Sequence, residues 1–134
     1  MTVDLRSVHL AVDDHDAALA FYGGALGLAV GADIVRNCAR VVTLCTTTRT
    51  DMDIVLSSPR PRSVDRAVDA LAIGPYPGGL RALDFATLEL ATVFDRAVAT
   101  PGVEAWQEPI TRSDGSRDIV VLDPAGNVSR IVQG

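Results

Sequence analysis

Apolar and polar residues alternate along several short stretches of the chain, as they do in half-buried β-strands. Within residues 5–12, the apolar positions 8, 10 and 12 share one side of the strand, and His9 lies on the other side. The same alternation in residues 52–57 places Asp53 on the more polar side. Two further strands are predicted between these, over residues 29–35 and 39–46.

A helix is predicted between the first two strands, over residues 16–26. The segment Asp13-Asp14-His15-Asp16 interrupts the alternation and offers a side chain that can cap the first turn. Gly27 follows the last apolar position, where glycine commonly ends a helix. The first half of the chain therefore runs strand, helix, strand, strand, strand.

The second half repeats this order at low sequence similarity. An offset of 73 positions aligns residues 8–12 with 81–85, and an offset of 77 aligns residues 52–55 with 129–132. The pattern predicts a helix over residues 89–100 and strands over residues 80–88, 103–107, 117–122 and 128–133. Two βαβββ modules, with helices and strands in both, predict an α+β fold.

The modules are predicted to occupy residues 1–58 and 80–134, joined by a linker over residues 59–79. This linker contains four prolines and three glycines, which favour turns. A helix would cover one face of each sheet, and the two remaining faces would together form a cup. One set of alternating strand positions would face this cup: His9, Asp53, Ala82, Asp84 and Arg130.

Composition narrows the classes of partner and compartment. The net charge of −5 disfavours a nucleic-acid partner, because proteins that bind nucleic acids neutralise the phosphates with basic residues. No apolar run approaches the ~20 residues that a membrane-spanning helix needs, and no signal peptide is recognised. We therefore expect a cytoplasmic protein that binds neither membranes nor nucleic acids. The two cysteines, Cys38 and Cys45, are expected to remain reduced.

A family resemblance is carried by motifs near both ends of the chain. They are Val8-His9-Leu10-Ala11-Val12, Ala20-Phe21-Tyr22, Leu26-Gly27-Leu28, Val121-Leu122-Asp123-Pro124-Ala125-Gly126-Asn127 and Ile131-Val132-Gln133. In these the chain resembles the vicinal oxygen chelate superfamily, which includes glyoxalase I, extradiol dioxygenases and bleomycin-resistance proteins. The resemblance implies two βαβββ modules in a curved mixed sheet with a central cup and outer helices. It also implies a homodimer, in some members with exchanged modules.

Metal-dependent members of that superfamily hold a divalent cation at four strand positions. The resemblance assigns these positions to His9, Asp53, Ala82 and Arg130, with Arg130 replacing the usual final glutamate. A guanidinium group stays protonated and has no lone pair for a metal, and alanine has no donor at all. We therefore expect no metal and no other cofactor.

Each candidate ligand-binding residue has a structural alternative. Arg130 either pairs with Asp53 or Asp84, or binds a carbonyl, phenolate or carboxylate of a ligand. Trp106 either packs in the core or forms an apolar wall for a flat ligand. Tyr76, in the linker, either rims the cup or belongs to a rigid turn. The same choice applies to His9, which either hydrogen-bonds within the cup or contacts the ligand.

The favoured hypothesis is a non-catalytic protein that sequesters a small aromatic or polycyclic natural product and so gives antibiotic resistance or self-resistance. The first alternative is a metal-free lyase or isomerase with Asp84 or Asp53 as base and Arg130 as oxyanion stabiliser. The second is a divalent-metal enzyme of the glyoxalase or dioxygenase type. The third is an accessory protein whose cup forms a dimer interface.

Overall fold

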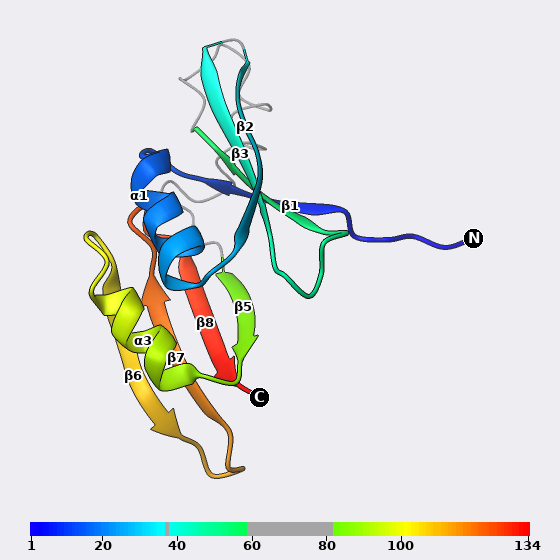
Figure 1. The fold of residues 1–134 in the computed structure, drawn as a ribbon. Helices are drawn as coiled ribbons and strands as arrows, with labels where there is room; N and C mark the ends of the chain where they lie inside the picture. Colours follow the sequence, from blue (N-terminus) through cyan, green and yellow to red (C-terminus); the bar gives the residue numbers. More distant parts are fainter. Residues whose placement is uncertain (37, 59–81) are drawn as a thin grey trace, which may run out of the picture.

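The computed structural model of the chain describes residues 1–36, 38–58 and 82–134. These residues form two four-stranded sheets with helical segments beside them (Figure 1). In chain order the described elements are β1 (Ser7–Ala11), α1 (His15–Leu19), η1 (Ala20–Ala25), β2 (Ala29–Arg36), β3 (Ala39–Cys45), β4 (Asp53–Ser57), β5 (Ala82–Thr87), α3 (Leu90–Val98), β6 (Glu104–Thr111), β7 (Arg117–Leu122) and β8 (Val128–Gln133).

The two sheets have the same topology. Their strand orders are β1-β4-β3-β2 and β5-β8-β7-β6, and the first strand of each module lies parallel to the last. Ser7 pairs with Asp53 and Ala82 pairs with Val128, the same separation along the chain in both modules. The predicted α+β fold with a repeated βαβββ order is confirmed. Both β1 and β5 are edge strands of their own sheets.

The first helix begins and ends at residues that the sequence indicates. Asp14 caps it, because its carboxylate accepts a hydrogen bond of 3.0 Å from the backbone N–H of Ala17. Gly27 follows with a positive φ of 74°, which glycine adopts without steric cost. The second half of this helix, η1, is π-helical, a feature that the sequence pattern does not predict.

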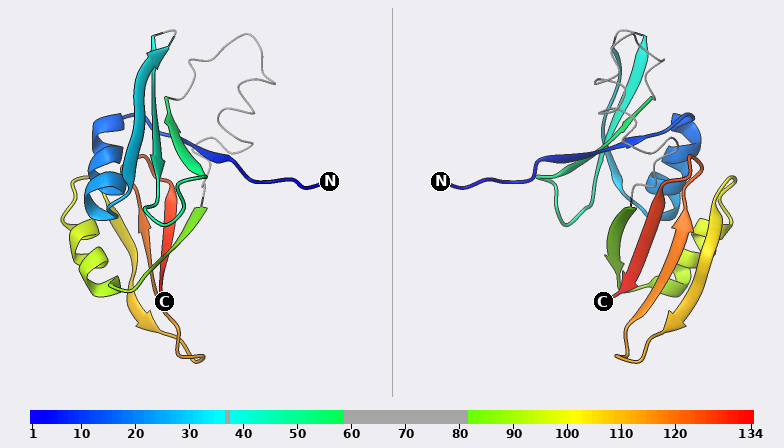
Figure 2. Two further views of the ribbon diagram at one scale, coloured as in Figure 1. Left: turned by 45° about the vertical axis from the view of Figure 1, so that its right-hand side comes forward. Right: turned by 180° about the vertical axis from the view of Figure 1, so that it is seen from behind.

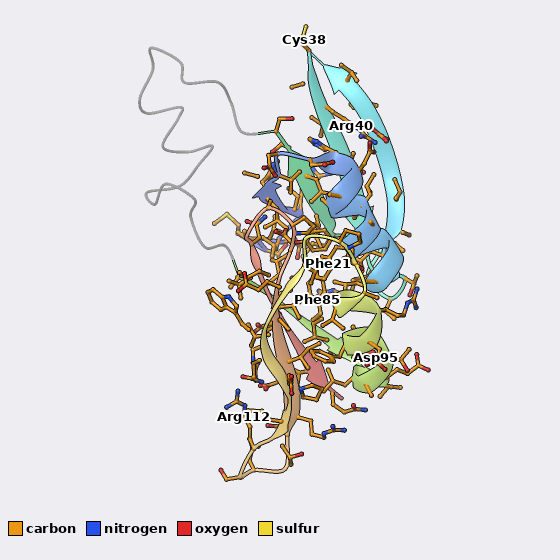
Figure 3. All side chains as sticks on the ribbon, turned by 90° about the vertical axis from the view of Figure 1, so that its left-hand side faces the viewer. Phe21, Cys38, Arg40, Phe85, Asp95 and Arg112 are labelled. Atoms are coloured by element: carbon orange, nitrogen blue, oxygen red, sulfur yellow. The ribbon has the colours of Figure 1, made fainter. Side chains whose placement is uncertain are left out.

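The hydrophobic core lies between the helices and the sheets. Figures 1 and 2 show α1 and α3 on the same side of the molecule, where α3 packs against η1. Phe21 and Tyr22 are fully buried and meet edge to face, with ring centroids 4.7 Å apart. Figure 3 shows Phe21 and Phe85 near the middle of the molecule. Burial of each such aromatic side chain contributes about 1.5–3 kcal/mol.

A turn in the second module is fastened to the first. The carboxylate of Asp123 accepts hydrogen bonds from the backbone N–H groups of Ala125 and Asn127 at 2.9 and 2.8 Å. The side-chain amide of Asn127 donates to the carbonyl of Ala11, at the end of β1, over 3.1 Å. Gly126 has φ 92°, so only glycine fits this turn without strain. The motif Asp-Pro-Ala-Gly-Asn therefore connects the second module to the first through a hydrogen bond.

His15, the first residue of α1, is buried, and its Nε2 lies 3.3 Å from the carbonyl oxygen of Leu56 in β4. Cys38 and Cys45 are both free, and Cys38 lies in the turn before β3 (Figure 3). Among the described helices, none has the length and apolarity to cross a membrane.

Candidate functional site

Four residues form a row across the second sheet, one from each strand. The register places Asp84 opposite Arg130, Arg130 opposite Val120, and Val120 opposite Gln107. Adjacent strands lie about 4.8 Å apart, so the row spans the whole width of the sheet. The next residues along these strands, Phe85 and Ile131, pack toward the core. The row therefore lies on the face away from α3.

Asp118 joins the polar residues of this face into one cluster. Its side chain is fully buried, and its two carboxylate oxygens accept five hydrogen bonds. Arg130 donates from Nε at 3.1 Å and Nη2 at 2.7 Å, and Arg112 donates from Nε at 2.9 Å and Nη2 at 3.1 Å. Gln107 donates from Nε2 at 2.6 Å. We call Gln107, Arg112, Asp118 and Arg130 the arginine cluster.

These contacts fix the charge of the arginine cluster. Hydrogen bonds from Arg112, then Gln107 and Arg130, hold the pKa of Asp118 well below its usual range despite its burial. The same contact with Asp118 raises the pKa of Arg112 further above its high usual value. The carboxylate therefore stays ionised at any physiological pH, and it cannot act as a general base.

The close carboxylate partner of Arg130 is Asp118, rather than Asp53 or Asp84, the two partners considered from the sequence. Asp84 approaches only to 3.9 Å, from its Oδ2 to Nη1 of Arg130, and its side chain is 68% exposed. Sequence reasoning missed both Asp118 and Arg112. The sequence does contain a signal for Asp118. Val120 is opposite Arg130, and Asp118, two positions earlier on the same strand, points to the same face of the sheet.

Trp106 lies in an irregular part of the edge strand β6. The pairing of β6 with β7 shifts between Ala105 and Gln107, so Trp106 has no opposite residue. Such a bulge re-aims a side chain and often occurs at sheet edges. The Trp106 residue is 53% exposed, beside Gln107 of the arginine cluster. Full packing in the core, one of the two alternatives for Trp106, is excluded.

His9 and Asp53 lie on neighbouring strands of the first sheet. His9 is opposite Val55 and Asp53 is opposite Ser7, so the two residues are diagonal neighbours on one face. Both are exposed, and Nε2 of His9 lies 3.5 Å from Oγ of Ser7. Within one chain they belong to a different sheet from Asp84 and Arg130. Tyr76 lies outside the described residues.

A cavity of about 520 Å³ opens between the two modules. Its wall is mostly apolar, with Asp84 the one carboxylate among its described lining residues. This volume falls within the range of about 300–1,000 Å³ that small-molecule sites occupy. The apolar part of the wall includes Val8, Ile54, Leu83, Phe85 and Ile131. Asp84, which lines this cavity, also lies 3.9 Å from Nη1 of Arg130.

The residues at the four family metal positions do not fit a divalent cation. Arg130 presents a protonated guanidinium that is bound to Asp118. This guanidinium has no lone pair to donate to a metal, and its positive charge repels a dication. Ala82 has no donor, and His9 and Asp53 lie on the other sheet. Across residues 1–36, 38–58 and 82–134, no three His, Cys, Asp or Glu side chains gather as metal ligands.

Comparison with known proteins gives a match over nearly the whole chain. The model of the Glyoxalase/Bleomycin resistance protein/Dioxygenase superfamily matches residues 5–131. Among solved structures, UcmS2 is 24% identical with a TM-score of 0.76, and the alignment covers 100% of both chains. None of the curated proteins matches the sequence.

Two further solved structures have the same fold. TnmS3, an antibiotic binding protein from Streptomyces sp. CB03234, is 22% identical with a TM-score of 0.70, covering 98% of this chain and 95% of TnmS3. Lactoylglutathione lyase from Agrobacterium tumefaciens is 22% identical with a TM-score of 0.68, covering 100% of this chain and 96% of the lyase. One fold thus serves both binding and catalysis in these proteins, so function depends on the site.

Proposed function

The chain belongs to the Glyoxalase/Bleomycin resistance protein/Dioxygenase superfamily, and on this premise we propose that it binds and sequesters a small aromatic or polycyclic natural product. The product is held without being transformed. A producer or target cell would gain antibiotic resistance or self-resistance, because the bound compound is withdrawn from solution. The expected compartment is the cytoplasm.

The observation that carries this proposal is the pairing of Arg130 with Asp118. At the strand position where metal-dependent relatives need a carboxylate, this chain has a cation whose charge is already engaged by a buried carboxylate. Rebuilding a metal site would require two changes. The Arg130–Asp118 pair would have to be lost, and a donor side chain would have to replace Ala82. Sequestration requires only apolar walls and a few placed polar groups, which the exposed Trp106 and the arginine cluster supply.

The similarity to TnmS3 supports the same class of ligand. That protein is an antibiotic binding protein, and it matches this chain over 98% of its length. An exposed tryptophan offers a flat apolar surface against which an aromatic ring system can stack. Here Trp106 lies on the same sheet as the arginine cluster, so a flat ligand on it would reach polar donors.

We propose further that the protein is a homodimer and that each binding cup lies between two chains. Within one chain the candidate residues are divided, with His9 and Asp53 on the first sheet and Asp84, Trp106 and Arg130 on the second. Two copies that exchange modules would bring the first sheet of one chain beside the second sheet of the other. The edge strands β1 and β5 are available for this approach.

Binding is tested by titrating Trp106 fluorescence with polycyclic antibiotics and then extracting the ligand for mass spectrometry. We expect saturable quenching and recovery of the unaltered compound. The variant Trp106→Phe, which removes the only tryptophan, supplies the baseline for absorption by the ligand itself. Recovery of a chemically altered compound would overturn sequestration and favour a metal-free lyase or isomerase with Asp84 or Asp53 as its base.

A further inference from the structure

The two arginines of the cluster do not use all of their donors on Asp118. Each guanidinium carries five N–H groups. Arg130 uses Nε and Nη2 for Asp118, and Arg112 uses Nε and Nη2 for Asp118 and Gln107. Among the described residues, neither Nη1 has an acceptor within hydrogen-bond distance. Two Nη1 groups thus remain to donate.

The guanidinium groups of Arg112 and Arg130 belong to partly exposed side chains and carry the excess charge of the cluster. The side chains of Arg112 and Arg130 are 43% and 39% exposed, whereas Asp118 is fully buried between them. One carboxylate faces two guanidinium groups, which leaves one positive charge uncompensated within the cluster. Asp84 compensates it weakly, because it stays 3.9 Å away and is itself largely exposed, and Asp114 adds a Coulombic contribution at Arg112.

Rigidity distinguishes this pair from ordinary surface arginines. An unrestrained arginine loses side-chain entropy when it binds a ligand, but a guanidinium already held by two hydrogen bonds has lost most of it. Both forks are anchored to the same carboxylate, and Gln107 anchors the fork of Arg112 as well. Figure 3 shows Arg112 on the side of the second sheet away from α3, where the candidate site lies.

We propose that Arg112 and Arg130 together bind an anionic oxygen group, a carboxylate or phenolate, on the ligand. This inference rests on the proposed function and narrows it to acidic polycyclic compounds. The aromatic body of the ligand lies along Trp106, and its acidic group receives hydrogen bonds from the two Nη1 groups. Arg112 is then a specificity-determining residue, and Asp118 is a positioning residue that never touches the ligand.

The test uses two fluorescent probes of the same shape, 2-anthracenecarboxylate and the neutral 2-anthracenecarboxamide. Dissociation constants are measured for the unmodified protein and for Arg112→Gln. We expect the carboxylate to bind about tenfold more tightly than the amide, since a charge-assisted hydrogen bond is worth that much. Arg112→Gln should remove most of this advantage and change binding of the amide less than about twofold.

Arg117→Gln is the matched control. Arg117 is an exposed arginine on the same strand as Asp118, so its replacement changes the net charge equally without touching the cluster. It should preserve the preference for the carboxylate. Circular dichroism and the melting temperature verify that each variant folds, and Arg112→Lys provides a second variant that keeps the charge but loses the fork.

The outcomes separate this inference from the proposed function. Tight binding of the carboxylate that Arg112→Gln abolishes, and that Arg112→Lys restores only partly, supports the anionic-group site. Equal binding of the two probes would overturn it and leave sequestration of neutral compounds standing. Binding of neither probe, by a folded protein, would count against the proposed function itself.

Discussion

The phenol of Tyr22 donates a hydrogen bond of 2.5 Å to the carboxylate of Asp123, across 101 positions of sequence. Tyr22 belongs to the helix of the first module, and Asp123 begins the turn that fastens the second module. Burial and the neighbouring Asp123 both raise the pKa of Tyr22, so the phenol remains a donor. This bond connects the two motifs that carry the family resemblance, and it gives both a structural role.

Replacing Tyr22 by phenylalanine should destabilise the protein without changing its ligand preference. The variant removes one buried donor, while Asn127 Nδ2 still donates to the same Asp123 oxygen at 2.9 Å. Loss of one partner from a buried hydrogen bond to a charged group costs about 1–3 kcal/mol. Urea unfolding followed by circular dichroism measures this cost.

The control for this prediction is a double-mutant cycle, which compares Tyr22→Phe, Asp123→Asn and the variant that carries both changes. If the bond is real, the two single changes should be less than additive when combined, by about 0.5 kcal/mol or more. Strict additivity would show that Tyr22 and Asp123 contribute independently, and the proposed fastening of the modules through this pair would then be wrong.

Acidification should weaken the protein through Asp118. The pKa of this residue is lower in the folded protein than in the unfolded chain, where it is about 3.9. The unfolded chain therefore takes up the proton first, and the stabilising contribution is present above about pH 4 and is lost as the pH falls further. Asp118→Asn should be less stable at neutral pH and should show a flatter loss of stability below pH ~4.

Free energies of unfolding between pH 7 and pH 2.5, from urea titrations, provide the comparison. Asp95→Asn is the matched control, because Asp95 is an exposed carboxylate on α3, far from Arg112 (Figure 3). This control should keep the acid dependence of the unmodified protein. An unchanged acid dependence in Asp118→Asn would contradict the assignment of an ionised, doubly paired carboxylate.

The sequence predicts most strand and helix positions because their periodicity is local. The predicted strands over residues 117–122 and 128–133 coincide with β7 and β8. It underestimates β6, where the bulge at Trp106 interrupts the alternation. The π-helical turn has no periodic signature of its own. The arrangement of the modules depends on contacts between them, such as those of α3 with η1, which the periodicity within one module does not encode.

The site is predictable only in part, for a similar reason. Alternation alone places Arg130 on the face away from the helix, where pairing with a carboxylate is one of the two alternatives that the sequence offers. The identity of the carboxylate that pairs with Arg130 depends on the register between β7 and β8. It also depends on the side-chain conformations of Arg112 and Arg130, which both extend to Asp118. Arg112 lies just past the end of β6, where alternation gives no direction.

Trp106→Ala should affect ligand binding much more than stability. The residue is 53% exposed on an edge strand, and substitutions at such positions usually change stability by about 0.5 kcal/mol or less. Loss of an aromatic stacking surface should weaken binding of 2-anthracenecarboxylate about tenfold. The fluorescence of the probe reports binding, since the variant has no tryptophan.

Val98→Ala is the control for Trp106→Ala. Val98 is a comparably exposed apolar residue, but it lies on α3, behind the sheet that carries Trp106. This variant should bind the probe like the unmodified protein. If both variants bind alike, Trp106 does not contact the ligand, and the placement of the aromatic body along β6 is wrong.

The N-terminal segment gives a direct test of the proposed dimer. Met1, Val3 and Leu5 are exposed apolar residues at alternate positions, and the segment projects away from the body of the molecule (Figures 1 and 2). In a homodimer with shared cups, this segment would be covered by the partner chain. Leu5→Glu should then dissociate the dimer and weaken probe binding in parallel, because each cup needs both chains.

Thr2→Glu, the control for Leu5→Glu, adds the same charge to the same segment at a polar position and should leave both properties unchanged. Sedimentation equilibrium at micromolar concentrations measures the association. A monomeric unmodified protein that still binds the probe would contradict the shared cup.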